Sequence, residues 1–137
     1  MRFLLDTNIC IYAIKQKPLI VKERLQKVNP GDVGISIITL AELEYGAAKS
    51  QNPQRNRETL TRFCSPFQIV DFCPEDAQKF GQIRATLEQQ GEPIGSYDLL
   101  IAAQAVNRGV TLVTNNIREF SRVEGLSLEN WVEESLS

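Results

Sequence analysis

Five short apolar segments alternate along the chain with longer stretches of helical spacing, and this alternation limits the possible folds more than any other feature. The predicted strands are residues 2–6, 32–37, 67–72 and 110–114, with a weaker fifth near 126–128. The predicted helices are residues 8–16, 19–28, 38–50, 54–64, 75–90 and 97–108. The strand segments are apolar or β-branched without clean alternation, as in strands covered on both faces. The order of elements therefore predicts an α/β fold with a parallel sheet flanked by helices.

Length and composition fit one soluble domain spanning residues 1–137. The chain has 137 residues, of which 42% are hydrophobic and 23% charged, so it can bury a sizeable core. No run approaches the roughly 18 apolar residues of a membrane span, and we expect a cytoplasmic protein without membrane contact. The three cysteines show no CxxC spacing and are expected as free thiols. Because the net charge is −2, nucleic-acid binding would need a local basic face.

The chain contains no histidine, which narrows the chemistry available to it. Histidine is the commonest general base and the commonest metal ligand in proteins. A serine or cysteine nucleophile here would have no histidine to activate it, so triad chemistry is excluded. Any hydrolytic activity must therefore depend on carboxylates and a hard cation.

Four polar side chains follow predicted strands or begin predicted helices, and they are the candidate site residues: Asp6, Glu42, Asp98 and Asn116. Each has a structural alternative. Asp6 can serve as a helix N-cap, and Asn116 begins a similar cap pattern. Thr39 and Glu42 have the spacing of a capping box. Asp98 lies where the helix dipole favours an acid.

The joint pattern of these positions favours a site over four separate caps. In a parallel sheet, the helices that follow strands begin along the same carboxyl edge, where α/β folds place their sites. Asp98 shares a helix face with Ile101, Ala102 and Ala105, so its carboxylate is expected to be partly desolvated. Carboxylates that converge need a counter-charge, and Mg²⁺ or Mn²⁺ supplies it. Such a cation lowers the pKa of a coordinated water and stabilises the attack on a phosphodiester.

Several segments, taken in order, resemble the PIN-domain ribonucleases, and in particular the VapC-type toxins of VapBC toxin–antitoxin pairs. The matching segments are Leu5-Asp6-Thr7-Asn8, Ile38-Thr39-Leu40-Ala41-Glu42-Leu43 with Tyr45-Gly46, Gly81-Gln82-Ile83-Arg84-Ala85, Ile94 to Ala103, Leu112-Val113-Thr114-Asn115-Asn116, Glu119-Phe120, and Gly125-Leu126 through Trp131. The likeness covers nearly the whole chain.

The resemblance implies a PIN-like three-layer sandwich with a five-stranded, mainly parallel sheet. It also implies an acidic pocket that binds Mg²⁺, for which Mn²⁺ can substitute. By position, Asp6 and Asp98 resemble the principal metal ligands, and Glu42 the third acid, which holds a metal or orients the water. Many PIN domains have an aspartate where this chain has Asn116. Since an amide brings no charge, we expect one tightly held ion rather than two.

The resemblance further implies a type II toxin that hydrolyses RNA phosphodiesters. The segments around Asp6 and Asn116 are similar to the branch that cuts initiator tRNA in the anticodon loop. Tyr45, Tyr97 and Arg84 are candidate RNA contacts, with ordinary core or surface positions as the alternative. The implied partners are a VapB-type antitoxin and a second copy of the chain. Homodimers of this kind assemble with antitoxin into larger hetero-oligomers.

Two other readings of the sequence remain. The first strand of aspartyl-nucleophile phosphatases also ends in aspartate, but these enzymes need a second aspartate where this chain has Asn8. The second alternative is a non-catalytic RNA- or protein-binding module that keeps the PIN fold. The three acids favour catalysis, whereas Asn116 and the net charge leave the module open.

Overall fold

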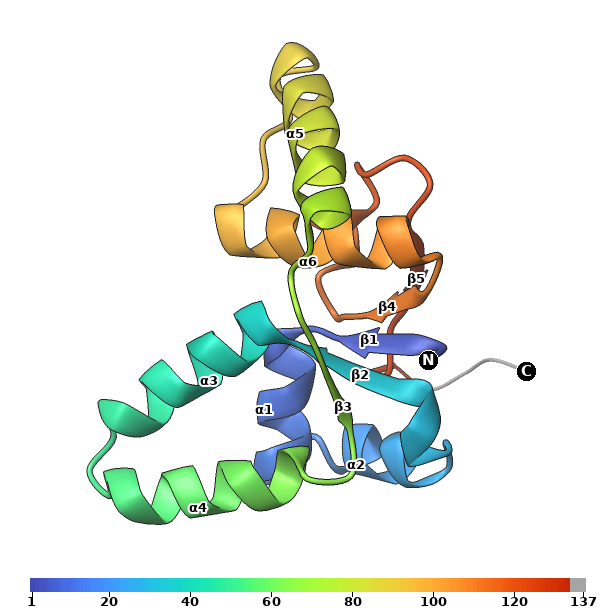
Figure 1. Ribbon diagram of the computed structural model, residues 1–137. Helices are drawn as coiled ribbons and strands as arrows, with labels where there is room; N and C mark the ends of the chain where they lie inside the picture. The colour runs from blue at the N-terminus through green and yellow to red at the C-terminus, as the bar shows by residue number, and fades with distance from the viewer. Residues whose placement is uncertain (134–137) are drawn as a thin grey trace.

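The five predicted strands form one parallel sheet in the computed structural model, which describes residues 1–133 (Figure 1). The strands are β1 (Phe3–Leu5), β2 (Val33–Ser36), β3 (Gln68–Val70), β4 (Thr111–Val113) and β5 (Ser127–Glu129), and their order in the sheet is β3-β2-β1-β4-β5. Leu4 of β1 pairs with Gly34 on one side and with Leu112 on the other. The first strand of the chain therefore lies at the centre of the sheet.

The six predicted helices are present within a few residues of their expected bounds. They are α1 (Thr7–Lys15), α2 (Leu19–Gln26), α3 (Ile37–Ala48), α4 (Pro53–Cys64), α5 (Pro74–Gln89) and α6 (Ser96–Arg108). Pro53 and Pro74 begin α4 and α5, and Gly109 ends α6 with a φ of 64° that favours glycine. The short α7 (Ile117–Phe120) and a 3₁₀ turn, η1 (Pro30–Asp32), were not among the predicted helices.

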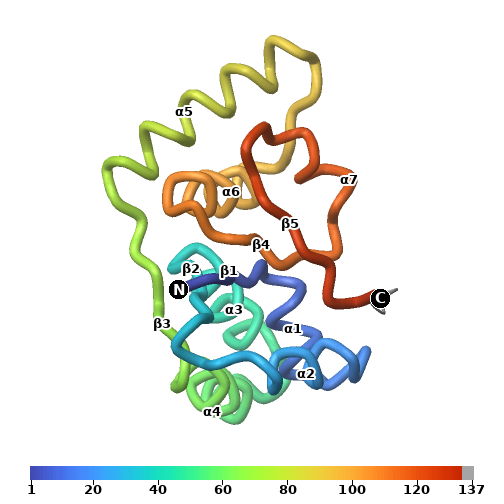
Figure 2. Tube along the Cα trace, turned by 90° about the vertical axis from the view of Figure 1, so that its right-hand side faces the viewer, coloured from blue at the N-terminus to red at the C-terminus, as the bar shows by residue number. Residues whose placement is uncertain are grey.

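Helices cover both faces of the sheet, giving the predicted three layers (Figure 2). On one face, α1 to α4 pack on Phe3 and Leu5 of β1, and Trp131 meets Phe3 edge to face with ring centroids 5.5 Å apart. On the other face, α5, α6 and α7 pack on Leu4 and on neighbouring residues of β4. Since successive residues of β1 enter different cores, this central strand has apolar side chains at every position.

The topology brings the starts of three helices to one edge of the sheet. Strands β2, β1 and β4 are neighbours, and each is followed within a few residues by α3, α1 or α7. This carboxyl edge is where the sequence predicts the site. Among residues 1–133, no helix is both long and apolar enough to cross a membrane. Cys10, Cys64 and Cys73 are free thiols, as predicted.

Candidate active site

Asp6 lies at the end of the central strand and also begins a helix. Its backbone N–H donates to Val113 O at 3.0 Å, which continues the pairing of β1 with β4. Its Oδ1 accepts from the Ile9 backbone N–H at 2.9 Å and so caps α1. The residue is only 4% exposed. The capping prediction is therefore confirmed, and a carboxylate with two oxygens can cap a helix and still face the site.

The surroundings of Asp6 disfavour its charged form. Burial raises the pKa of its carboxyl from 3.8 to about 6. Hydrogen bonds from the Thr114 side chain and the Ile9 backbone oppose this shift, while the negative charges of Asp98 and Glu42 add to it. Two of the predicted acids thus lie within electrostatic reach of Asp6.

Glu42 belongs to this acidic group and does not form the alternative capping box. The N-cap of α3 is Ser36, whose hydroxyl accepts from the Ile38 backbone N–H at 3.0 Å. Thr39 lies inside the helix and is buried. Glu42 Oε1 instead accepts from Thr7 Oγ1 at 2.8 Å, so the residue after Asp6 holds this carboxylate beside the start of α1.

Asp98 occupies the first turn of α6, as predicted, and is half-buried. Burial raises the pKa of its carboxyl, and the charges of Glu119 and Glu42 raise it further. The predicted apolar face is present, since Ile101 and Ala102 are fully buried. Asp98 is therefore a partly desolvated acid facing other acids.

Asn116 contacts the acidic group through a residue that was not among the predicted site residues. Its Nδ2 donates to Glu119 Oε2 at 3.1 Å, and its backbone N–H donates to Thr114 Oγ1 at 2.9 Å. Glu119 and Thr114 are thus additional members of the site. The sequence offers a signal for each: Glu119 follows Asn116 by one helical turn, and Thr114 directly follows β4.

The three candidate RNA contacts differ in availability. Tyr45 and Tyr97 are 65% and 61% exposed and stand near Glu42 and Asp98 in the sequence. Arg84 is occupied by Glu88, with its Nε 2.8 Å from Oε1, and its guanidinium lies over the Phe80 ring. Lys49 Nζ lies over the Tyr45 ring, 4.8 Å from its centroid. Of the three, Tyr97 is therefore the best candidate for stacking on RNA bases.

The donor set fits a magnesium ion held mostly by water. In the described part of the chain, no lysine or arginine forms an ion pair with the predicted acids. Within residues 1–133, there is also no group of three or more His, Cys, Asp or Glu side chains close enough together to hold a metal ion. Mg²⁺ prefers oxygen ligands and usually takes one or two carboxylates while keeping several waters. Asp6 and Asp98 are the two desolvated acids here that could supply such carboxylates.

The acidic group is separate from the cavity between α5, α6 and the segment after α7. This cavity has a volume of about 230 Å³ and is lined by residues that include Lys79, Gln82, Arg122 and Glu124. None of the predicted site residues lines it. The candidate site is therefore separate from this cavity.

Comparison with known proteins agrees with this geometry. The family model described as "PIN domain" matches residues 3–126. A tRNA(fMet)-specific endonuclease VapC of Shigella flexneri is 50% identical over 131 residues, covering 96% of this chain and 98% of that protein. A ribonuclease VapC2 of Haemophilus influenzae is 48% identical over 132 residues, covering 96% and 99%.

Solved structures give the same result. A chain of the DNA-bound VapBC from Salmonella typhimurium superposes with a TM-score of 0.90 at 46% identity, covering 96% of this chain and 98% of that one. A chain of VapBC2 from Rickettsia felis, bound to a DNA fragment from its promoter, gives 0.89 at 43% identity, covering 96% and 99%. The five-stranded parallel sheet and the order of its helices are thus those of these relatives. The chain belongs to the PIN-domain family, among its VapC ribonucleases.

Proposed function

We propose that the chain is the toxin of a type II toxin–antitoxin system and a metal-dependent endoribonuclease. The observation that carries the proposal is the buried Asp6 carboxylate, whose pKa is raised to about 6 by burial while Asp98 and Glu42 add negative charge nearby. A folded protein that keeps like charges together without a cationic side chain destabilises itself, unless a ligand supplies the missing charge.

The roles of the site residues follow from their surroundings. Asp6 and Asp98 would hold Mg²⁺, with Mn²⁺ as a substitute, because both are desolvated acids at the carboxyl edge. When bound, the cation would neutralise these acids and act as the Lewis acid of phosphodiester hydrolysis. Glu42, fixed by Thr7, would orient the attacking water, and Asn116 would keep Glu119 in place beside Asp98. With these groups, hydrolysis needs no nucleophilic side chain.

The proposed substrate is a tRNA, with initiator tRNA cut in the anticodon loop as the first candidate. The Shigella flexneri and Salmonella typhimurium relatives, 50% and 46% identical to this chain, are named tRNA(fMet)-specific endonucleases. An anticodon loop presents unstacked bases, which proteins recognise by stacking and backbone contacts. The exposed rings of Tyr45 and Tyr97 suit that mode of binding.

The proposed protein partner is a VapB-type antitoxin. The similar chains of Salmonella typhimurium and Rickettsia felis were solved as VapBC assemblies. A basic antitoxin side chain placed beside Asp6 would supply a counter-charge as a cation does, and a polar one would supply hydrogen bonds. Toxin inhibition and metal binding would then compete for one group of acids.

The test is a cleavage assay of the antitoxin-free chain with initiator tRNA and an elongator tRNA, each in Mg²⁺, Mn²⁺ or EDTA. We expect one discrete cut in initiator tRNA, lost in EDTA and reduced at least on the order of a hundredfold in Asp6→Asn. Asp32→Asn is the matched control, because Asp32 lies at the opposite edge of the sheet beside Arg2. Intact RNA under every condition, from folded wild-type protein, would favour the non-catalytic binding module. A cut that survives in EDTA would contradict the metal role.

A further inference from the structure

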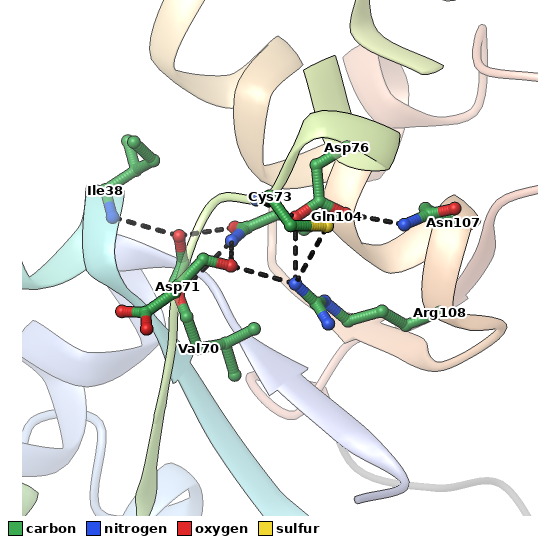
Figure 3. Close-up of polar contacts among 9 residues, drawn as sticks. Ile38, Val70, Asp71, Cys73, Asp76, Gln104, Asn107 and Arg108 are labelled. Atoms are coloured by element: carbon green, nitrogen blue, oxygen red, sulfur yellow. Dashed lines mark hydrogen bonds and ion pairs between the residues drawn. The ribbon is translucent and has the colours of Figure 1, made fainter. Parts of the chain in front are cut away.

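Gln104 is a fully buried polar side chain in the middle of α6, and every polar atom of its amide is used. Its Oε1 accepts from the Ser36 hydroxyl. Its Nε2 lies 3.3 Å from Val70 O and 3.2 Å from Asp71 O. Figure 3 shows the Gln104 amide beside Val70 and Asp71, where β3 ends. One side chain therefore joins α6 to the carboxyl ends of two neighbouring strands, β2 and β3.

The contact with Ser36 reaches a second helix of the site. The hydroxyl that donates to Gln104 also accepts from the Ile38 backbone N–H at 3.0 Å, as the N-cap of α3. Glu42 lies on α3, less than two turns after this cap. Gln104 therefore connects the helix that carries Asp98 to the start of the helix that carries Glu42.

The C-terminal end of α6 is held by further contacts, which share the Asp71 carbonyl with Gln104 but do not involve α3. Asn107 Nδ2 donates to Asp76 Oδ1 at 2.8 Å, and Arg108 pairs with Asp76 Oδ2 at 2.8 Å (Figure 3). Arg108 also donates to Asp71 O at 2.8 Å. These bonds join α6 to the start of α5 and to the residue after β3. They lack the connection to α3 that the Gln104 contacts have.

We propose that Gln104 is a positioning residue for the nuclease site: through Ser36 and the end of β3, its amide sets the place of Asp98 relative to Glu42 and Asp6. This role rests on the function proposed above. Asp98 lies six residues before Gln104 on the same helix, which is about 9 Å at 1.5 Å per residue. A shift of α6 at Gln104 would therefore displace the Asp98 carboxylate, because a helix moves as a rigid rod over that length.

The experiment compares Gln104→Met with Asn107→Leu in the antitoxin-free full chain. Methionine keeps the length and flexibility of glutamine but removes its hydrogen bonds. Asn107→Leu is the matched control, because it removes the hydrogen bond from Asn107 to Asp76 and leaves the Gln104 contacts in place. Mn²⁺ affinity is measured by calorimetry, and kcat and KM on initiator tRNA are measured at a temperature where both variants are folded. We expect both to lower Tm, whereas only Gln104→Met weakens Mn²⁺ binding and lowers kcat, each on the order of tenfold.

Ser36→Ala provides a second variant. It removes the same hydrogen bond from the other partner, together with the N-cap bond to Ile38, and keeps the two carbonyl contacts of Gln104. If Gln104 acts through Ser36, the double variant should weaken Mn²⁺ binding by less than the product of the two single effects. Mn²⁺ affinity and kcat in Gln104→Met equal to those of Asn107→Leu would overturn the positioning role alone. Failure of the wild type to bind Mn²⁺ and cut RNA would overturn the nuclease proposal, and this role with it.

Discussion

Two buried aspartates of this molecule have pKa values that are shifted in opposite directions. Asp6 is 4% exposed and Asp76 is 0% exposed, and each stands at the start of a helix. Burial raises the pKa of Asp6 to about 6, and neighbouring acids add to the shift. Burial also acts to raise the pKa of Asp76, but hydrogen bonds from Cys73 and Asn107 and the charge of Arg108 lower it below its usual value.

The difference distinguishes an acid with an internal counter-charge from one without it. Asp76 receives its counter-charge from within the protein, so its ionised form stabilises the junction of α5 and α6. Asp6 lacks such a partner among the described residues and would gain one from the proposed cation. Burial alone would not distinguish them, whereas the direction of the pKa shift does.

The largest effect on stability is expected from removing the compensated acid. Asp76→Ala leaves the Arg108 guanidinium without its carboxylate, and Arg108 Nε is already buried without a partner among the described residues. We expect a loss of about 3 kcal/mol in the free energy of unfolding. Urea denaturation measures it, with Glu75→Ala in the same helical turn as control. A loss no greater than in that control would show that the ion pair contributes little.

The second effect is on the pH dependence of the free energy of unfolding, to which the two acids contribute with opposite sign. Because the folded pKa of Asp6 is about 6 and the ordinary value 3.8, the folded state keeps a proton that the unfolded state releases. The metal-free protein should therefore lose on the order of 2–3 kcal/mol of stability from this group as pH rises from 4 to 7. The ionised Asp76 carboxylate stabilises the folded state at any pH above the pKa that Asp76 has in the unfolded chain. This stabilisation is lost only below about pH 4, as pH falls through the lowered pKa of the folded state.

The difference between Asp6→Asn and wild type isolates the Asp6 contribution. Asparagine can still cap α1 but does not titrate. In EDTA, the variant should equal wild type near pH 4 and be more stable at pH 7, as followed by urea denaturation at several pH values. Equal stability at pH 7 would show that Asp6 has an ordinary pKa.

A smaller gain in stability of the metal-free protein is expected from replacing Asp98, which is only half-buried. Burial and the charges of Glu119 and Glu42 raise the pKa of its carboxyl, so Asp98→Asn should relieve repulsion and increase the Tm of the metal-free protein. Cleavage of tRNA should be lost in the same variant. A lower Tm would instead support the interpretation of Asp98 as a structural acid at the helix start.

The smallest effect is expected at Asn116. Asn116→Asp replaces a hydrogen bond to Glu119 with a like charge, which should cost less than about 0.5 kcal/mol without metal. If this position faces the ion, the new carboxylate should tighten Mn²⁺ binding, measured by calorimetry. Unchanged Mn²⁺ affinity would place Asn116 outside the metal site, as a residue that only holds Glu119.

The fold could be predicted from the sequence because its signals are local. The central strand is a continuous apolar segment, and Pro53, Pro74 and Gly109 mark helix boundaries through backbone geometry alone. The site residues were selected by the same reasoning, since acids that follow strands of a parallel sheet meet at one edge. Their catalytic and metal-binding roles remain predictions.

What the sequence could not give are contacts between residues far apart in the chain. The capping-box interpretation of Glu42 was wrong because Ser36 already caps α3 and Thr7 binds the carboxylate. Gln104 has the appearance of a surface residue until the ends of β2 and β3 are placed against it. Asp76 in a first helical turn looks exposed, and only the packing of α6 brings Arg108 to it.

The central place of β1 also determines when, during synthesis of the chain, the proposed nuclease site can be assembled. Leu4 pairs with Gly34, which is synthesised soon afterwards, and with Leu112, which comes near the end of translation. Until β4 leaves the ribosome, one edge of β1 stays open, and neither Thr114 nor Glu119 can join Asp6 and Asp98. A ribosome-bound fragment that stops before residue 110 should therefore be harmless to tRNA. Since assembly of the site awaits these late residues, the proposed activity cannot appear before synthesis of the chain is nearly complete.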